Sequence, residues 1–164
     1  MKISRTVPIV VVNFAMAIAA HAEGLCTVEE TVVFNCELEK SISSLCQTKG
    51  SGVLVYRNGN DGKINLEIYG GNGVGRDVFY FSNTSYAGGG EAHIRFSRFG
   101  YAYYLYDRTI KTEGGPTFSA GIVVYKGRKR ISNLMCNNDA SIREEAYREI
   151  AREKYRPIDV DREN

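Results

Sequence analysis

Tryptophan is absent from this 164-residue chain, and histidine is scarce, with two residues. His21 lies in an N-terminal segment that we expect to be removed, so His93 is expected to be the one imidazole of the mature protein. No G-x-S-x-G motif accompanies it, which disfavours Ser/His/Asp catalysis. If Ile94 and Phe96 point inward, strand alternation turns His93 toward solvent. We therefore expect a surface or hydrogen-bonded histidine and not a catalytic one.

Closely spaced cysteine pairs are also missing. No C-x-x-C motif occurs, so a zinc site is not predicted. In an exported chain, four cysteines predict two disulfides, which leave no thiol for Cys/His catalysis. A hairpin that turns near Glu39 and Lys40 puts Cys36 opposite about Ser43, so a bond from Cys36 to Cys46 is out of register. We expect Cys136 to bond to Cys26 or to Cys36. The four cysteines are Cys26, Cys36, Cys46 and Cys136.

The first residues predict a secretory signal peptide at positions 1–22. Lys2 and Arg5 precede an apolar run at 7–20, and an A-x-A cleavage site follows. The run is short of the roughly 20 apolar residues that span a bilayer. We expect Glu23 to be the first mature residue, no stable membrane span after processing, and a location in the periplasm or outside the cell.

Removal of this segment leaves no net charge. The whole chain has 21 Lys and Arg against 19 Asp and Glu. Lys2 and Arg5 depart with the signal, so 19 basic residues remain against 19 acidic ones. Global electrostatics therefore gives no support for a nucleic acid or an anionic membrane as partner. The remaining roughly 142 residues are of the size of one domain.

From Thr31 onward the pattern predicts strands. Short β-branched and aromatic runs alternate with glycine- and asparagine-rich turns. The strongest hairpin signal joins residues 53–56 to residues 64–69 across Asn-Gly and Asp-Gly turns. We count about eight or nine short antiparallel strands in residues 23–140. This pattern predicts a mainly β domain, either a barrel or a sandwich, stapled by disulfides.

Neither the glycine-rich stretch at 70–75 nor any carboxylate pair predicts a cofactor or an active site. A dinucleotide-binding loop is followed by a helix, whereas residues 77–81 read as a strand. Glu67, Asp77 or Glu91 could belong to a glycosidase pair by residue type, but no motif supports that role. We predict no cofactor, no metal and no catalytic residue.

A helix is predicted in residues 141–156, packed on the β domain. Ser141 and Glu144 form a capping box. Pro157 ends the pattern, and residues 157–164 read as a polar tail. An apolar stripe every four residues can dock on a sheet: Ile142, Ala146 and Ile150.

Tyrosine is abundant, with eleven residues, and residues 99–106 form the most aromatic segment. Period two assigns one set of side chains to the buried face: Phe99, Tyr101, Tyr103 and Leu105. Tyr104 and Tyr106 then face outward, where tyrosine is favoured in binding surfaces. A basic turn lies nearby in the sequence. The candidate binding surface therefore consists of Tyr104, Tyr106, Arg128, Lys129 and Arg130.

The assembled motifs resemble an uncharacterised group of small exported disulfide-containing β-proteins of Gram-negative bacteria. The resemblance covers Cys26 to Cys136 and is carried by VFNC, KSISSLC, VYRNG with GKINLEI, GGGEAHIRF, FGYAYYLY, and AGIVV with GRKRISNLMC. This group supplies no catalytic residue. A second likeness, of size, compartment and architecture alone, is to periplasmic lysozyme inhibitors.

These observations favour an exported periplasmic binding protein without catalytic activity. We expect its partner to be another protein of the cell envelope, as for an inhibitor or an immunity protein. The alternative is a carrier that holds a small apolar ligand in a barrel cavity. An enzyme of unrecognised type is the least favoured alternative, because no catalytic motif was found.

Overall fold

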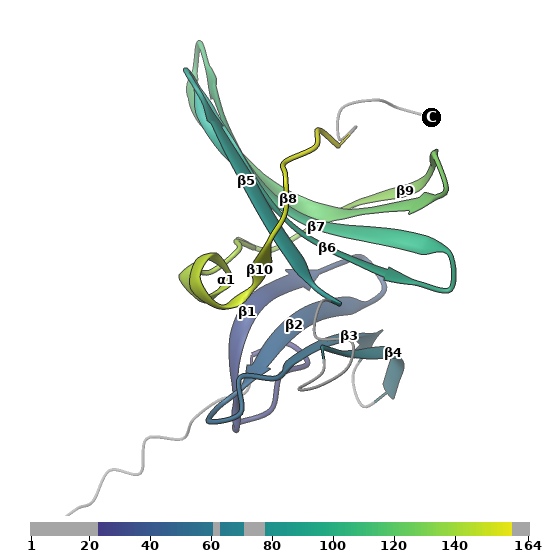
Figure 1. Ribbon diagram of the computed structural model, residues 1–164. Coiled ribbons are helices and arrows are strands. Elements are labelled where there is room, and N and C mark those ends of the chain that lie inside the picture. The colour runs from purple at the N-terminus through teal and green to yellow at the C-terminus, as the bar shows by residue number, and fades with distance from the viewer. Residues whose placement is uncertain (1–22, 61–62, 71–77, 159–164) are drawn as a thin grey trace, which may run out of the picture.

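In the part of the chain that the structure describes, two mainly antiparallel sheets pack face to face, with one short helix at one end (Figure 1). The sheets do not close into a barrel, so the mainly β prediction is confirmed in its sandwich form. The predictions of a signal peptide, of a glycine-rich loop and of a polar tail fall wholly or largely outside the described residues and stay predictions. The computed structural model describes residues 23–60, 63–70 and 78–158.

The first half of the chain forms one sheet, called sheet A here. Each strand pairs with the next along the chain, as expected where turns are short. Alternating residues of each strand face the second sheet. In spatial order, the strands are β1 (Glu30–Glu37), β2 (Ile42–Thr48), β3 (Leu54–Asn60) and β4 (Lys63–Gly70).

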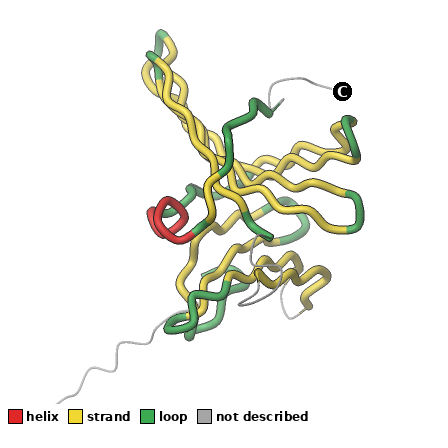
Figure 2. Tube along the Cα trace, in the orientation of Figure 1, coloured by secondary structure: helices red, strands yellow, loops and turns green. Residues whose placement is uncertain are grey.

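The second half forms sheet B, which lies above sheet A in Figure 1. Its strands also follow chain order, except that β10 (Ala151–Arg152) adds to the β5 edge in parallel orientation. Figure 2 shows the long strands of this sheet continuing past sheet A. The other strands are β5 (Tyr80–Tyr86), β6 (Gly89–Arg98), β7 (Tyr101–Thr112), β8 (Gly115–Lys126) and β9 (Lys129–Met135).

Aromatic rings fill the space between the sheets. The ring centroid of Tyr56 in sheet A lies 4.5 Å from that of Phe96 in sheet B. Phe96 also stacks on Tyr103 at 4.9 Å. Full burial of one such side chain stabilises the fold by about 1.5–3 kcal/mol. The sandwich core is therefore the main source of stability, as expected for a domain of this size.

Both disulfides form, and each has a different structural role. Cys36 stands opposite Ser43, as predicted from the hairpin register. Cys36 bonds to Cys136, one of the two pairings expected, and this bond joins β1 of sheet A to the end of β9. Cys26 bonds to Cys46 within the N-terminal part. All four cysteines are thus oxidised, which is compatible with an extracellular or periplasmic protein.

The helix is much shorter than predicted. α1 spans Glu144–Glu149, Arg143 is its N-cap, and Ser141 makes no capping bond. The predicted apolar stripe is correct, because Ile142, Ala146 and Ile150 are all buried. The chain then becomes extended at Ile150, and β10 pairs with β5. The open backbone edge of β5 supplies these hydrogen bonds, and this tertiary pairing overrides the local helical pattern.

Both ends of the described chain cover outer faces of the sandwich. The backbone amide of Leu25 donates to the Ser44 hydroxyl, which lays the N-terminal residues on sheet A. Residues 151–158, called the C-terminal segment here, cross the outer face of sheet B (Figure 1). Ile158 is buried there, so the expectation of a wholly frayed tail from residue 157 is wrong at this position.

Candidate functional site

His93 lies under the C-terminal segment and not in solvent. Its side chain is 1 % exposed, so the expectation that it faces solvent is wrong. The strand alternation itself is correct, because Ile94 and Phe96 point into the sandwich core. The error arises because the outer face of the sheet is covered by residues from a distant part of the chain.

A buried hydrogen-bonded cluster surrounds this histidine. His93 Nε2 bonds to the Glu91 carboxylate, and the Tyr155 hydroxyl donates to the same carboxylate at 3.0 Å. The Tyr155 ring stacks on the imidazole at 5.1 Å. Burial, followed by the charge of Glu91 and its hydrogen bond, raises the pKa of Tyr155 to about 12, so the phenol stays a donor. A substrate could reach the imidazole only if the C-terminal segment moved.

An ion pair anchors the same segment. The Arg95 guanidinium donates to both carboxylate oxygens of Glu153 at 2.7–3.0 Å. The hydrogen bonds to Glu153 outweigh burial and raise the pKa of Arg95. The Glu153 amide also donates to the Phe81 carbonyl at 2.9 Å. These contacts fix the segment where it leaves the sheet edge.

The two tyrosines assigned to a binding surface are covered. Tyr106 is 0 % exposed, so its assignment to the surface is wrong. Its hydroxyl donates to Met135 Sδ at 2.8 Å, and its ring packs in a cluster with Val123 and Ile158. Tyr104 is half-buried, with its ring 5.8 Å from that of Tyr125. Both residues lie on the outer face of sheet B, as predicted. The C-terminal segment covers this face, so the residues there form a second, small core.

An exposed aromatic residue lies instead at one end of sheet B. Phe99 was predicted to be buried, but its side chain is 81 % exposed. It occupies the turn between β6 and β7, where its φ of 51° is in the left-handed region. The turn breaks the alternation on which the prediction rested, while Tyr103 keeps its predicted contact with the core.

One basic side chain contacts Phe99, and further basic side chains lie at the same end of the sheet. The Arg98 guanidinium lies 4.5 Å from the Phe99 ring centroid, and Lys126 Nζ lies 5.2 Å from that of Tyr101. Arg128 and Lys129, which the sequence placed in the candidate surface, are exposed in the next turn, and Arg130 is half-buried. Both turns project at the right of sheet B in Figure 1. The turn end is defined by Arg98, Phe99, Tyr101, Lys126, Arg128 and Lys129.

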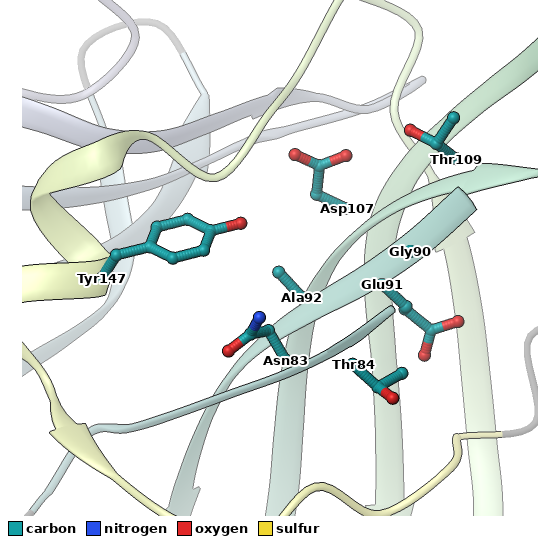
Figure 3. Close-up of a pocket in the computed structure, with 8 residues that line it drawn as sticks. All are labelled: Asn83, Thr84, Gly90, Glu91, Ala92, Asp107, Thr109 and Tyr147. Atoms are coloured by element: carbon teal, nitrogen blue, oxygen red, sulfur yellow. The ribbon is translucent and has the colours of Figure 1, made fainter. Parts of the chain in front are cut away.

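The opposite end of sheet B carries an extension with a pocket at its base. Residues 84–91 and 108–119, called the arm here, continue the β5–β6 and β7–β8 hairpins past the core. A pocket of about 200 Å³ lies where the arm meets α1. Figure 3 shows the Asp107, Tyr147, Asn83 and Ala92 side chains around it, while those of Thr84 and Glu91 point away. No local sequence pattern indicates this pocket, because its residues come from four elements.

Among the described residues, one group of possible metal ligands comes together: Cys26, Glu30 and Cys46. Its two sulfurs form a disulfide, and Arg57 binds the Glu30 carboxylate at 2.7 Å. This donor set does not fit a metal ion, because thiolate ligands are absent and the carboxylate is already paired. Of the carboxylates weighed for glycosidase chemistry, Glu67 pairs with Arg57, Glu91 is buried, and Asp77 lies outside the described residues.

Comparison with known proteins yields no matching family model, no matching curated protein and no matching solved structure. Within residues 23–60, 63–70 and 78–158, no helix has the length and apolar character needed to cross a membrane.

Proposed function

We propose that this chain is an exported, non-catalytic binding protein whose partner is another protein, and that the turn end is its contact surface. Phe99 carries the proposal. Its ring is almost fully exposed, and its backbone is held in a conformation that costs a non-glycine residue about 1–3 kcal/mol. Stability alone would favour glycine or asparagine in a two-residue hairpin turn. The exposed apolar ring and the left-handed backbone of Phe99 are both unfavourable for stability, so we attribute this residue to binding.

The chemistry of the turn end indicates the kind of partner. An exposed ring flanked by arginine resembles the aromatic and arginine anchors that dominate protein interfaces. Arg98, Lys126, Arg128 and Lys129 make this end basic. We therefore expect a partner surface with an apolar pocket for Phe99 and acidic residues around it. Since the mature chain is expected to be neutral overall, the attraction would be local.

Export is part of the same proposal. The two disulfides suit an oxidising compartment. We place the protein in the periplasm or outside the cell, with Glu23 as its first residue after signal removal. Intact-mass measurement of protein isolated from the periplasm tests this step, and retention of Met1 would contradict it.

The binding proposal is tested with Phe99→Asn. Asparagine tolerates the left-handed region, so this variant should melt at the same or a higher temperature than the wild type. The wild-type protein is first used to capture and identify a partner from envelope extract. Affinity for the purified partner should then fall at least about tenfold in the variant, as for loss of an interface anchor.

Phe118→Asn is the matched control, because Phe118 is also exposed, at 73 %, but lies on the arm. It should leave affinity for the partner unchanged. Equal loss of affinity in both variants, or unchanged affinity in Phe99→Asn, would overturn the assignment of the turn end.

The alternative of an apolar-ligand carrier depended on a barrel cavity, and an open sandwich does not supply that architecture.

A further inference from the structure

The pocket at the base of the arm contains a carboxylate without a counter-charge. Asp107 Oδ2 accepts a hydrogen bond from the Ile142 amide at 3.0 Å. Among the described residues, no cationic group lies within ion-pair distance of this carboxylate. The Arg152 guanidinium donates to Oδ1 of Asn83, a pocket residue, at 2.8 Å and lies over the Phe81 ring.

Burial makes this unpaired charge unfavourable. Burial raises the pKa of Asp107, and the hydrogen bond from Ile142 offsets only part of that effect. The Tyr147 phenol faces the same hollow, and burial together with the charge of Asp107 raises its pKa, against the opposing charge of Arg152. The phenol therefore stays neutral, and its hydroxyl points into the hollow that Asp107 lines (Figure 3).

We propose that this pocket binds an alkylammonium or guanidinium group, with the Asp107 carboxylate as counter-ion and the Tyr147 hydroxyl as a neutral acceptor. Carboxylate and hydroxyl oxygens both accept hydrogen bonds from such cations, and the charged bond strengthens where water is partly excluded. The site lies at the opposite end of sheet B from the turn end, so it is independent of the proposed function.

The size of the pocket limits the ligand. Sites for drug-sized molecules run from about 300 to 1,000 Å³, and this pocket holds about 200 Å³. One lysine- or arginine-like side chain is therefore the suitable occupant.

Titration of ¹⁵N-labelled mature protein with small probes tests the proposal. The probes are Nα-acetyl-lysine methylamide, Nα-acetyl-arginine methylamide and the neutral isostere Nα-acetyl-norleucine methylamide. At millimolar concentrations, at least one cationic probe should shift the amides of Asn83, Asp107, Thr109 and Tyr147, and norleucine should not. Free lysine and arginine form a second set. Binding by the blocked amides indicates a side chain within a peptide, whereas binding by the free amino acids alone indicates a small-molecule ligand.

Asp107→Asn should weaken cation binding at least about tenfold, because the charge-assisted bond is lost. Asparagine can still accept the Ile142 hydrogen bond, and the amide spectrum reports whether the fold is kept. Asp139→Asn is the matched control at an exposed carboxylate and should bind like the wild type. Tyr147→Leu is a second variant, which keeps an apolar contact to Phe81 and should also weaken binding. Equal shifts with norleucine, or wild-type affinity in Asp107→Asn, would overturn the proposal.

Discussion

Arg57 joins the N-terminal residues to the outer face of sheet A. Its guanidinium donates to the carboxylates of Glu30 and Glu67 and to the carbonyl of Leu25. Burial by itself would raise the pKa of Glu30, but the bonds and charge of Arg57, together with Thr27, lower it. The charged form of Glu30 is thus more favourable in the folded chain than in the unfolded chain.

Glu30→Gln should therefore destabilise the protein in a pH-dependent way. At neutral pH we expect a loss of about 1.5–3 kcal/mol, typical of hydrogen bonds to charged groups. A lowered folded pKa gives stability that is complete above the unfolded pKa and is lost as pH falls through the folded one. The difference between wild type and variant should shrink below about pH 4. Urea denaturation across pH measures it, and a difference that grows in acid would contradict the role of Arg57.

Tyr106 is the tyrosine on which the small outer core depends. It stands opposite Gly121, where a β-carbon would collide with the Leu134 carbonyl and the Tyr106 ring. We expect Tyr106→Ala to cost about 3–5 kcal/mol, as for other buried aromatic residues. Tyr104→Ala should cost less, because Tyr104 is half-buried. Thermal melts compare the stability of the two variants. A larger loss of stability in Tyr104→Ala would show that the outer core depends on Tyr104 and not on Tyr106.

At the scale of elements, strand positions were predictable and the C-terminal segment was not. Period-two alternation is local, so the sequence located the central part of each strand from Thr31 to Met135, but it missed the extensions that form the arm. The residues around Ala151 have helical propensity. They form a strand only because they pair with the edge strand β5. The turn at Arg128 and Lys129 was predicted from the strand patterns on either side of it, and its exposure from its charge. Phe99 and the Asp107 pocket were missed because turn geometry and long-range packing create them.

The C-terminal segment should loosen when its two anchors are removed. In Glu153→Ala/Tyr155→Ala, the ion pair to Arg95 and the bond to Glu91 are both lost. Hydrogen exchange should accelerate at the Glu153 amide, which bonds to Phe81, while amides between β6 and β7 stay protected. Lys154→Ala is the control in the same segment, since this side chain is exposed. Equal acceleration in the control would show that the anchors do not hold the segment.

For the whole molecule, the two disulfides should contribute unequally. Cys36–Cys136 spans a sequence separation of 100, and Cys26–Cys46 spans 20. Loop-closure entropy then assigns about 4.7 kcal/mol to the first bond and about 3 kcal/mol to the second. Urea denaturation of Cys36→Ala/Cys136→Ala and of Cys26→Ala/Cys46→Ala measures the difference. A greater loss in the second pair would show that local packing, and not chain length, dominates.

The Cys36–Cys136 bond also implies an order of maturation. In a chain that crosses a membrane N-terminus first, three thiols arrive long before the fourth. Strand alternation separates these three thiols. Cys36 lies in the core between the sheets, whereas Cys26 and Cys46 lie in a separate cluster. Once the first hairpin forms, Cys36 is therefore shielded from both neighbours by the thickness of its own sheet. If the chain is exported as proposed, this geometry disfavours the mispaired forms, and the Cys36–Cys136 bond forms only after the final strand has crossed the membrane.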